Sequence, residues 1–441
     1  KPPRSDAAFV FYNQVEKLAL FGVLMLKMIH RSTWFYCLLS FLLLSTACAE
    51  KVSHEDEMLV ANPQLSLHSV LEKTIARYPD SQMLEAKQLE IEARSKHAKG
   101  LLPHAPAIGL FSQNDSMMSG RGEKGWEAEL ELPIWLPGQR AAREAIAKDA
   151  ALGFTDLRDN LALQVAGLLR NALWDISMVS SQAKLAKSRY ETAQALVHDV
   201  EKRFKAGDLA KTDVMLAQNE AYQAETFKLR ANAEVKHAEF RYQLLTGLNQ
   251  LPADYSEKES TATLNESHPS LRDAAKKLLL ADDERNLVRA ERRENPSIAI
   301  NTRSQRGPFD NQSNESIGLR VRIPFETESK SAPLIANAEM NYARNQVESS
   351  RLRYTLEAAY HEAEHNLEVT RAELIITEKQ QANAQENLRL AKKAFALGES
   401  DLVNLLRIQA SAYEADRALQ QRQIQLQWDI AQYNQAVGEL P

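Results

Sequence analysis

The sequence predicts a mainly α-helical chain with a small β part, built as two structural repeats. The first observation is the scarcity of chain breakers, because the 441 residues include 15 glycines and 15 prolines, whereas ordinary proteins use about 7% and 5%. This composition favours long helices and excludes turn-rich all-β folds. Hydrophobic residues make up 44% of the chain and charged residues 26%, which excludes wholesale disorder. The mean hydropathy of −0.42 is too polar for a bundle of membrane-spanning helices.

The second observation is an internal repeat. A shift of 191 residues superposes the two halves of the chain without a gap. One register held across strand-like, helical and turn-like stretches indicates a duplication. The repeats are expected over residues 63–248 and 268–438, and the polar segment 249–267 between them is interpreted as a linker. The matched positions include Phe204 and Phe395, Gly207 and Gly398, Gln218 and Gln409, Tyr222 and Tyr413, Tyr242 and Tyr433, and Gly247 and Gly438.

The sequence predicts the same order of helices in each repeat. A first helix precedes the strands, a very long helix follows them, and a short turn leads into a returning helix. The expected ranges are 63–102 and 268–293 for the first helix, and 138–205 and 330–396 for the long one. A helix of 68 residues extends about 100 Å, beyond any compact domain. Its apolar residues recur in alternating steps of four and three, which is typical of coiled-coil packing. The seam in the first repeat comprises Leu157, Leu161, Val165, Leu168, Ala172, Ile176, Val179, Ala183, Ala186, Tyr190, Ala193, Val197, Val200 and Phe204.

Two β-strands are predicted between the first helix and the long helix of each repeat, at about 106–114 and 126–135 and at about 296–305 and 316–325. Apolar and charged residues alternate in the second strand of each pair, which indicates a sheet with one apolar and one charged face. The length suits a tilted membrane-spanning strand of about 9–11 residues; the alternative is a half-buried sheet in a soluble protein. Single-chain barrels need about eight or more strands, so a membrane barrel would require several chains. The charged residues expected to face a water-filled lumen are Glu127, Glu129, Glu131, Arg320 and Arg322.

Residues 28–49 have the features of a secretory signal peptide. Met28 is a candidate start, basic residues follow it, and an apolar stretch of about ten residues covers 35–44. This stretch is short for a retained membrane anchor, which would need about 18–20 residues. Residues 1–27 are interpreted as an upstream, non-native segment.

Signal cleavage is expected between Ala49 and Glu50, after an Ala-x-Ala site. The alternative is that Cys48 is the lipidated first residue, although Ser45 stands where lipoprotein signals prefer an aliphatic residue. The other cysteine, Cys37, lies within the signal, so we expect no disulfide and no cysteine metal site. The formal net charge of −5 excludes a nucleic-acid-binding protein.

One motif suggests zinc chemistry. His361-Glu362-Ala363-Glu364-His365 matches H-E-x-x-H, in which two histidines on one helix face hold zinc and the glutamate acts as a base. However, the motif lies inside the long helix of the second repeat, with Ala363 and Leu367 on its seam, and no third ligand is apparent. We interpret it as a solvated helix face and expect no catalytic residue, no cofactor and no metal site. Contact of the two histidines with a metal remains an open alternative.

Several motifs carry a resemblance to a known family. They are Leu67, Val70-Leu71 and Ala76-Arg77-Tyr78-Pro79 in the first helix, Leu132-Pro133-Ile134-Trp135-Leu136-Pro137-Gly138-Gln139-Arg140 after the second strand, and the twin turns Phe204-Lys205-Ala206-Gly207-Asp208 and Phe395-Ala396-Leu397-Gly398-Glu399. On these motifs the chain resembles the TolC family of outer-membrane efflux ducts over about residues 63–440. Within that family it is most similar to the outer-membrane components of cobalt–zinc–cadmium-type (heavy-metal RND) efflux systems.

The resemblance implies a homotrimer in the Gram-negative outer membrane. Four strands per chain would form a 12-stranded β-barrel in the outer-membrane lipid, and the long helices would form a periplasmic α-barrel. The implied partners are a periplasmic adaptor (membrane fusion) protein and an inner-membrane RND pump. The implied function is passive export, with metal cations as the first substrate class and drugs or secreted polypeptides as alternatives. A soluble periplasmic coiled-coil scaffold or adaptor is the competing hypothesis from another class.

The same resemblance assigns roles at the two turns. Adaptor docking would involve the twin turns, and a constriction would involve Asp213, Asn404 and Arg407. Asn404 and Arg407 depart from the acidic residues common in the family, which weakens the inference of an acidic, cation-attracting ring. The expected docking residues are Ala206, Gly207, Asp208, Leu209, Thr212, Asp213, Leu397, Gly398, Glu399 and Ser400. Asp208, Ser400 or Thr212 are expected to cap the helices that follow the turns.

Overall fold

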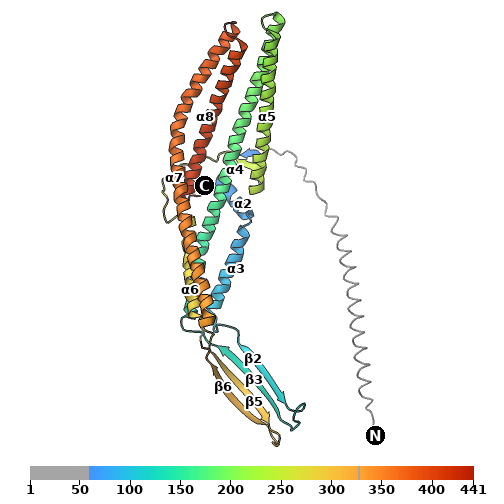
Figure 1. Ribbon diagram of the computed structural model, residues 1–441, viewed down its shortest axis with the longest axis vertical. Helices are drawn as coiled ribbons and strands as arrows, with labels where there is room; N and C mark the ends of the chain where they lie inside the picture. The colour runs from blue at the N-terminus through green and yellow to red at the C-terminus, as the bar shows by residue number, and fades with distance from the viewer. Residues whose placement is uncertain (1–58, 326–327) are drawn as a thin grey trace, which may run out of the picture. The chain divides into compact units, whose positions relative to one another are not determined.

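The computed structural model describes residues 59–325 and 328–441. The expected upstream segment 1–27, the signal peptide 28–49, Cys48 and the cleavage position between Ala49 and Glu50 lie outside the described residues. In the unit that begins at Met58, long helices lead from a small sheet at one end to two turns at the other end, and each of these turns connects two helices (Figure 1). The prediction of a mainly helical chain with a small β part is therefore confirmed.

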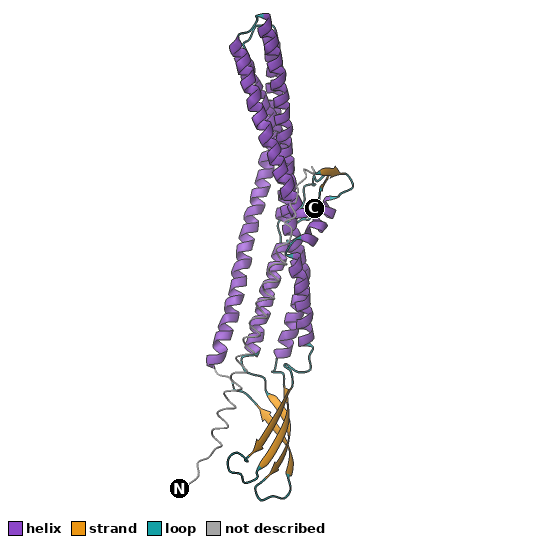
Figure 2. Ribbon diagram, turned by 90° about the vertical axis from the view of Figure 1, so that its right-hand side faces the viewer, coloured by secondary structure: helices purple, strands orange, loops and turns teal. Residues whose placement is uncertain are grey.

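The helices and strands follow the same order in both halves, except that the first half has two helices, α2 and α3, where the second half has α6 alone. The first half contains β1 (Val60–Asn62), α2 (Leu67–Arg77), α3 (Ser81–Ala98), β2 (Ala107–Asn114), β3 (Lys124–Pro133), α4 (Gln139–Ala206) and α5 (Lys211–Thr246). The second half contains β4 (Gln250–Pro252), α6 (Pro269–Ala290), β5 (Ser297–Arg306), β6 (Asn314–Arg322), α7 (Glu328–Ala396) and α8 (Leu402–Val437). The 68 residues of α4 and the 69 residues of α7 are each one continuous helix, in line with the long helices expected from the sequence (Figure 2).

Shorter helices accompany each long helix along part of its length. α4 packs against α5, α3 and α6, whereas α7 packs against α8 and α6. The end of α8 meets the start of α6, since a Cβ on Gly438 would lie 2.7 Å from Pro269. Among the described helices, none is long and apolar enough to cross a membrane.

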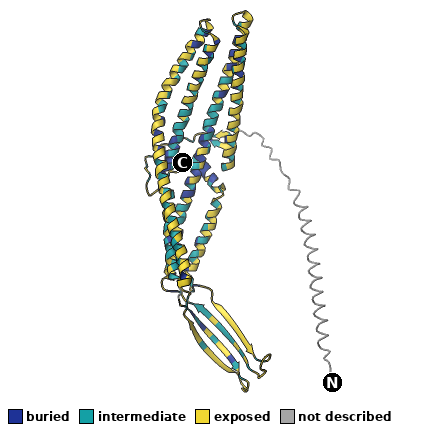
Figure 3. Cartoon of the chain, viewed as in Figure 1, coloured by how far each residue is buried: buried dark blue, intermediate teal, exposed yellow. Residues whose placement is uncertain are grey.

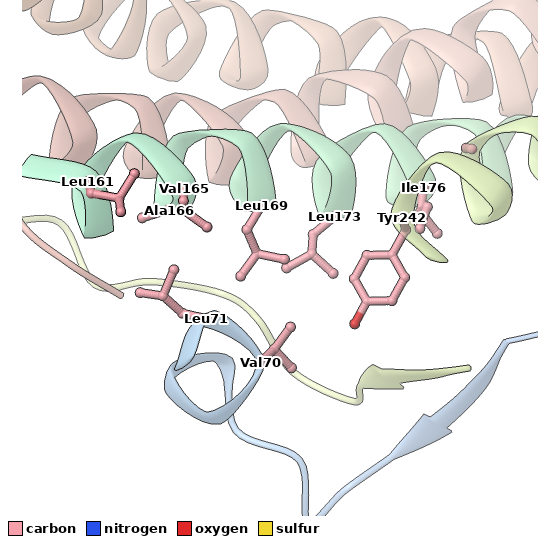
Figure 4. Close-up of a cluster of buried hydrophobic side chains, with 10 residues drawn as sticks. Val70, Leu71, Leu161, Val165, Ala166, Leu169, Leu173, Ile176 and Tyr242 are labelled. Atoms are coloured by element: carbon pink, nitrogen blue, oxygen red, sulfur yellow. The ribbon is translucent and has the colours of Figure 1, made fainter. Parts of the chain in front are cut away.

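The main hydrophobic core lies halfway along α4, where α2 and α5 pack against it (Figure 4). Val70 of α2, Val165 of α4 and Tyr242 of α5 are fully buried there. Burying a large apolar side chain stabilises a fold by about 1.5–3 kcal/mol, so this cluster fixes the position of α2. The Tyr242 hydroxyl donates a hydrogen bond to the Gln250 carbonyl at 3.0 Å, and burial raises the pKa of Tyr242 to about 12. Figure 3 shows the buried residues concentrated along this part of α4, with much of α7 exposed.

The single first helix expected over 63–102 is wrong, because the chain forms two helices there. α2 ends at Arg77, and Tyr78 adopts an extended conformation with ψ of 133°. Pro79 explains the break, since the residue before a proline is pushed out of the helical region. A second helix, α3, begins at Ser81.

The heptad seam accounts for only part of the buried surface of α4. Leu161, Val165 and Val200 are buried as expected, but Leu168 and Phe204 are 43% and 41% exposed. Leu169 and Leu173, which lie off the seam, are buried. The reason is that α4 contacts neighbours on more than one side, so a single coiled-coil stripe cannot describe its packing.

The segment 249–267 is more ordered than a plain linker. Its β4 pairs in parallel with β1, from Val60↔Gln250 to Asn62↔Pro252. Farther along, the Ser260 amide donates to Asn434 Oδ1 at 2.9 Å, and the Tyr433 hydroxyl donates to the Ala262 carbonyl at 3.0 Å. The segment is therefore attached to β1 at its start and to α8 at Ser260 and Ala262.

Candidate functional site: the four-stranded sheet and the helical turns

The larger sheet has the antiparallel order β2-β3-β5-β6. Register pairs Glu129 with Asn301 and Asn301 with Gly318, and directly paired residues share one face of a sheet. One face is thus mainly polar and the other mainly apolar. The polar face contains Glu127, Glu129, Glu131, Asn301, Arg303, Gln305, Ser316, Arg320 and Arg322.

The charged residues at the centre of the polar face form ion pairs. Arg320 Nη1 lies 2.8 Å from Glu129 Oε2, and its Nη2 lies 3.5 Å from Glu127 Oε1. Asn301 Nδ2 donates to Glu127 Oε1 at 2.6 Å, and a Cβ at Gly318 would lie only 2.3 Å from Asn301 Oδ1. A side chain at position 318 would therefore require the Asn301 amide to move.

The structure brings three of the five expected lumen residues together, namely Glu127, Glu129 and Arg320. Glu131 accepts a hydrogen bond from the Ser297 hydroxyl. Arg322 pairs with Glu294 at 2.9 Å, and Glu294 lies just before β5 begins. The polar face thus has a central ion-pair group and two separate contacts.

The apolar face is open. Leu110 on β2 and Ile317 on β6 are 82% and 83% exposed, and these strands form the two edges of the sheet. Exposed apolar surface with unpaired strand edges requires a cover, because such edges otherwise lead to aggregation. The large apolar side chains on this face are Ile108, Leu110, Trp126, Leu130, Leu132, Ile298, Ile300, Ile317, Leu319 and Val321.

At the other end of the helices, both turns use a left-handed glycine. Gly207 has φ of 87° and Gly398 has φ of 76°, and a Cβ on either would meet nothing within 4 Å. The constraint is therefore conformational rather than steric, because residues with a side chain disfavour positive φ. Each glycine ends its helix and reverses the chain.

The expected helix caps are wrong, and two aspartates take that role. The Ala210 amide donates to Asp213 Oδ2 at 3.0 Å, so Asp213 reaches back to the start of α5. Asp401 Oδ1 accepts from the Asn404 amide at 2.8 Å and caps α8. Asp208, Thr212 and Ser400 are not the capping residues. The sequence signal for the cap at Asp401 was an aspartate directly before the apolar run that begins α8.

A hollow of about 600 Å³ lies between the two turns. Of the expected docking residues, Asp208, Leu209, Leu397, Gly398, Glu399 and Ser400 line it, whereas Ala206, Gly207, Thr212 and Asp213 do not. Arg203 and Phe395, which were not among the expected docking residues, also line the hollow. The Arg203 guanidinium lies 4.8 Å from the Phe395 ring centroid, and Nη1 donates to the Phe395 carbonyl at 3.0 Å. This contact joins α4 to α7 across the two turns.

The expected constriction residues make local contacts. Arg407 Nη2 donates to Asn404 Oδ1 at 2.9 Å, and the Asn404 amide group donates to the Ser400 hydroxyl at 3.1 Å. The Asp213 carboxylate accepts from Ala210 in the other turn. Arg407 is therefore anchored beside Asn404 by a contact within α8.

Within the described part of the chain, no three histidine, cysteine or acidic side chains converge on a metal position. His361 and His365 lie exposed on α7, and their rings stack with centroids 6.4 Å apart. Ala363 and Leu367 between and beyond them are buried against α8, as the seam indicated.

Comparison with known proteins adds to this geometry. No protein-family model and no curated protein matches the chain, but solved structures do. The outer-membrane channel CmeC of Campylobacter jejuni has a TM-score of 0.69 at 13% identity, over 84% of this chain and 85% of that one. The outer-membrane protein VceC of Vibrio cholerae has a TM-score of 0.68 at 15% identity, over 85% and 96%. CusC, described for its transmembrane channel formation, has a TM-score of 0.69 at 13% identity, over 86% and 93%.

This chain has the TolC-type outer-membrane channel fold. The likeness extends over most of both chains, so the sheet, the long helices and the turns all belong to it. The fold inferred from the sequence motifs is confirmed, and the solved structures that share it are channels rather than enzymes.

Proposed function

We propose that this chain is the outer-membrane exit duct of a tripartite efflux system and works as a homotrimer. The observation that carries the proposal is the four-stranded sheet, with one apolar face, one ion-paired polar face and two unpaired edges. Edge-to-edge association of three copies would give twelve strands. This closure would cover the edges, place the apolar face against lipid and enclose the polar face around water.

The proposed mechanism is containment without catalysis. Arg320 pairs with both Glu127 and Glu129, so this group would add only one net negative charge per chain to the wall of a hydrated passage. The helices would continue the duct through the periplasm, and the substrate would be driven by a separate inner-membrane RND pump. The chain itself would bind no nucleotide.

The twin turns are the proposed docking surface for the periplasmic adaptor. Leu397 and Val403 are 64% and 59% exposed there, and the hollow beside Arg203 and Phe395 gives the surface a concave shape. Exposed apolar side chains next to a hollow are typical of a protein interface. Asp213, Asn404 and Arg407 remain the proposed constriction.

Metal cations are the proposed substrate class, and drugs or secreted polypeptides are the alternatives. This choice rests on the sequence motifs around Leu132-Pro133 and the twin turns, because the paired charges of the polar face favour no one substrate. A metal-sensitivity profile of a deletion strain tests it. Sensitivity to drugs alone would replace metal cations with organic substrates and leave the duct proposal intact.

Cysteine labelling of β6 tests the membrane barrel. Adjacent positions Ser316 and Ile317 are both exposed in the single chain but lie on opposite faces. Each is changed to cysteine, in a described region that contains no other cysteine. In isolated outer membranes a charged, membrane-impermeant thiol reagent should label Ser316→Cys and leave Ile317→Cys unlabelled.

Equal labelling of both variants would argue for the soluble scaffold. Fractionation provides an independent measurement, since the duct should be found in outer membranes as heat-resistant trimers. A monomer in the soluble periplasmic fraction would rule out the duct.

A further inference from the structure

The histidine pair on α7 offers a site that the duct does not use. His361 and His365 are four residues apart, and side chains at this spacing are neighbours on a helix surface. Their rings are nearly parallel, with an interplanar angle of 18° and centroids 6.4 Å apart. Both side chains are exposed, and neither makes a hydrogen bond or ion pair with another described residue. Two imidazoles are thus held close together and are free to bind.

We propose that His361 and His365 form a two-imidazole site for a transition-metal dication such as Cu²⁺, Ni²⁺ or Zn²⁺. Imidazole nitrogen is a preferred ligand of these ions, with metal–nitrogen distances of about 2.0–2.1 Å. Two nitrogens bound to one ion lie about 3 Å apart, a separation that rotation of these exposed side chains can reach. Water completes the coordination, because no third metal-ligating side chain of the described chain converges there.

The surrounding charges favour a cation. Glu362 and Glu368 lie within one turn of the pair and form no ion pair with a described residue. The nearest arginines along α7 are occupied, since Arg353 binds Glu266 at 2.7 Å and Arg371 binds Glu259. The unpaired charges nearest the pair along α7 are therefore negative, which raises the local concentration of dications.

The position on the helix keeps metal binding separate from folding. The buried side of this part of α7 is formed by Ala363 and Leu367, which pack on Tyr433 of α8. The histidines contribute nothing to that cluster, and alanine is the best helix former. His361→Ala and His365→Ala should therefore fold as the parent protein does.

The test is Cu²⁺ titration of the protein, purified without a polyhistidine tag and stripped of metal. We expect one Cu²⁺ per chain, with two nitrogen couplings in the electron paramagnetic resonance spectrum and one in each single variant. Loss of even an outer-shell partner weakens metal binding by about 10–100-fold, so each alanine variant should weaken Cu²⁺ binding by at least about tenfold. Affinity should follow Cu²⁺ above Ni²⁺ and Zn²⁺.

His198→Ala is the matched control. His198 is exposed on α4 and has Lys202 instead of a second histidine four residues later, so this variant should bind Cu²⁺ as the parent does. Unchanged Cu²⁺ binding in the double variant His361→Ala, His365→Ala would overturn the site. Equal binding of Mg²⁺ would also overturn it, because Mg²⁺ prefers oxygen ligands. Either failure leaves the exit duct untouched.

Discussion

Arg170 of α4 and Glu257 of the segment 249–267 form a buried, two-point ion pair. Arg170 Nε donates to Glu257 Oε1 at 2.8 Å and Nη2 donates to Oε2 at 2.6 Å, with the side chains 1% and 9% exposed. Arg170 also donates to the Glu439 carbonyl at 3.0 Å, and Asn434 donates to Glu257 at 3.1 Å. This group joins α4 of the first repeat, the connecting segment and the end of α8.

Breaking this pair should release the connecting segment. Arg170→Ala leaves the Glu257 carboxylate buried without its partner, and removing one member of a buried pair costs about 3–5 kcal/mol. Lys258 is exposed beside it and provides a trypsin site. We expect much faster cleavage at Lys258 in the variant, measured by the appearance of the two fragments with time.

Arg371→Ala is the control for this prediction. Arg371 pairs with Glu259 in the same segment, but the side chains are 47% and 38% exposed. Exposed pairs contribute about 0–1 kcal/mol, so cleavage at Lys258 should change little. Equal acceleration in both variants would show that the buried pair has no special role.

Asp283 of α6 should make the stability of the helical part depend on pH. Burial and the neighbouring Asp149 carboxylate of α4 raise the pKa of Asp283 to about 6. Other charges nearby are already paired, because Arg285 binds Asp282 and Arg94 binds Glu284 at 3.3 Å. Asp149 and Asp283 therefore share an interface between α4 and α6, and among the described residues no cation pairs with either carboxylate.

The sign follows from the raised pKa. In the unfolded chain Asp283 ionises near its ordinary pKa, whereas in the fold it keeps its proton to about pH 6, so stability falls between about pH 4 and pH 6 and stays lower above. Asp283→Asn should raise the melting temperature at pH 7.5 and leave it nearly unchanged at pH 4, as measured by circular dichroism. Asp282→Asn removes a weaker repulsion of Asp283 but also the partner of Arg285, so it should not raise the melting temperature. If the melting temperatures of Asp283→Asn and of the parent differed by the same amount at pH 4 and at pH 7.5, the prediction would be contradicted.

The sequence predicted the sheet better than the helix packing, for a physical reason. Strand side chains alternate between two contrasting environments, so Glu129 and Leu130 report the two faces directly. α4 instead has neighbours on several sides, and its buried residues therefore extend beyond one heptad stripe to Leu169 and Leu173. The break after Tyr78 was visible in Pro79, but the long apolar pattern on both sides concealed it.

Contacts that join distant parts of the chain could not be predicted from local patterns. An arginine such as Arg170 in the middle of a helix is normally expected to face solvent. Only its contact with Glu257, which is distant in the sequence, explains its burial. Likewise, Arg203 and Phe395 meet because the two repeats pack side by side near the turns. The two turn glycines could be predicted because a positive φ at a helix end favours glycine, and a glycine directly after a helical pattern is visible in the sequence.

Substituting the turn glycines should impair export without affecting membrane insertion. Alanine at Gly207 or Gly398 meets no neighbour, but the left-handed conformation costs about 1–2 kcal/mol. The turn should relax to a different shape and change the docking surface. Export is measured in cells lacking the parent gene, and trimers are measured in outer membranes.

Gly120→Ala provides a matched control for the strained turns. Gly120 has φ of 62° and open space around it, but it lies in the loop between β2 and β3, at the far end from the turns. It should carry the same local strain and leave export unchanged. Normal export by both Gly207→Ala and Gly398→Ala would show that the turns are not the docking surface.

A charge on the apolar face of β6 should prevent assembly in the membrane. Leu319 is 71% exposed in the single chain, so Leu319→Arg should leave the isolated fold unstrained. If this face contacts lipid, an arginine near the bilayer midplane costs about 2–4 kcal/mol per strand, and three copies would share the defect. We expect fewer trimers in the outer membrane and more protein in the periplasm or degraded. Ser316→Arg, on the polar face of the same strand, adds the same charge where water is expected and should assemble normally. Equal amounts of trimer for the two variants would mean that the apolar face is covered by something other than lipid.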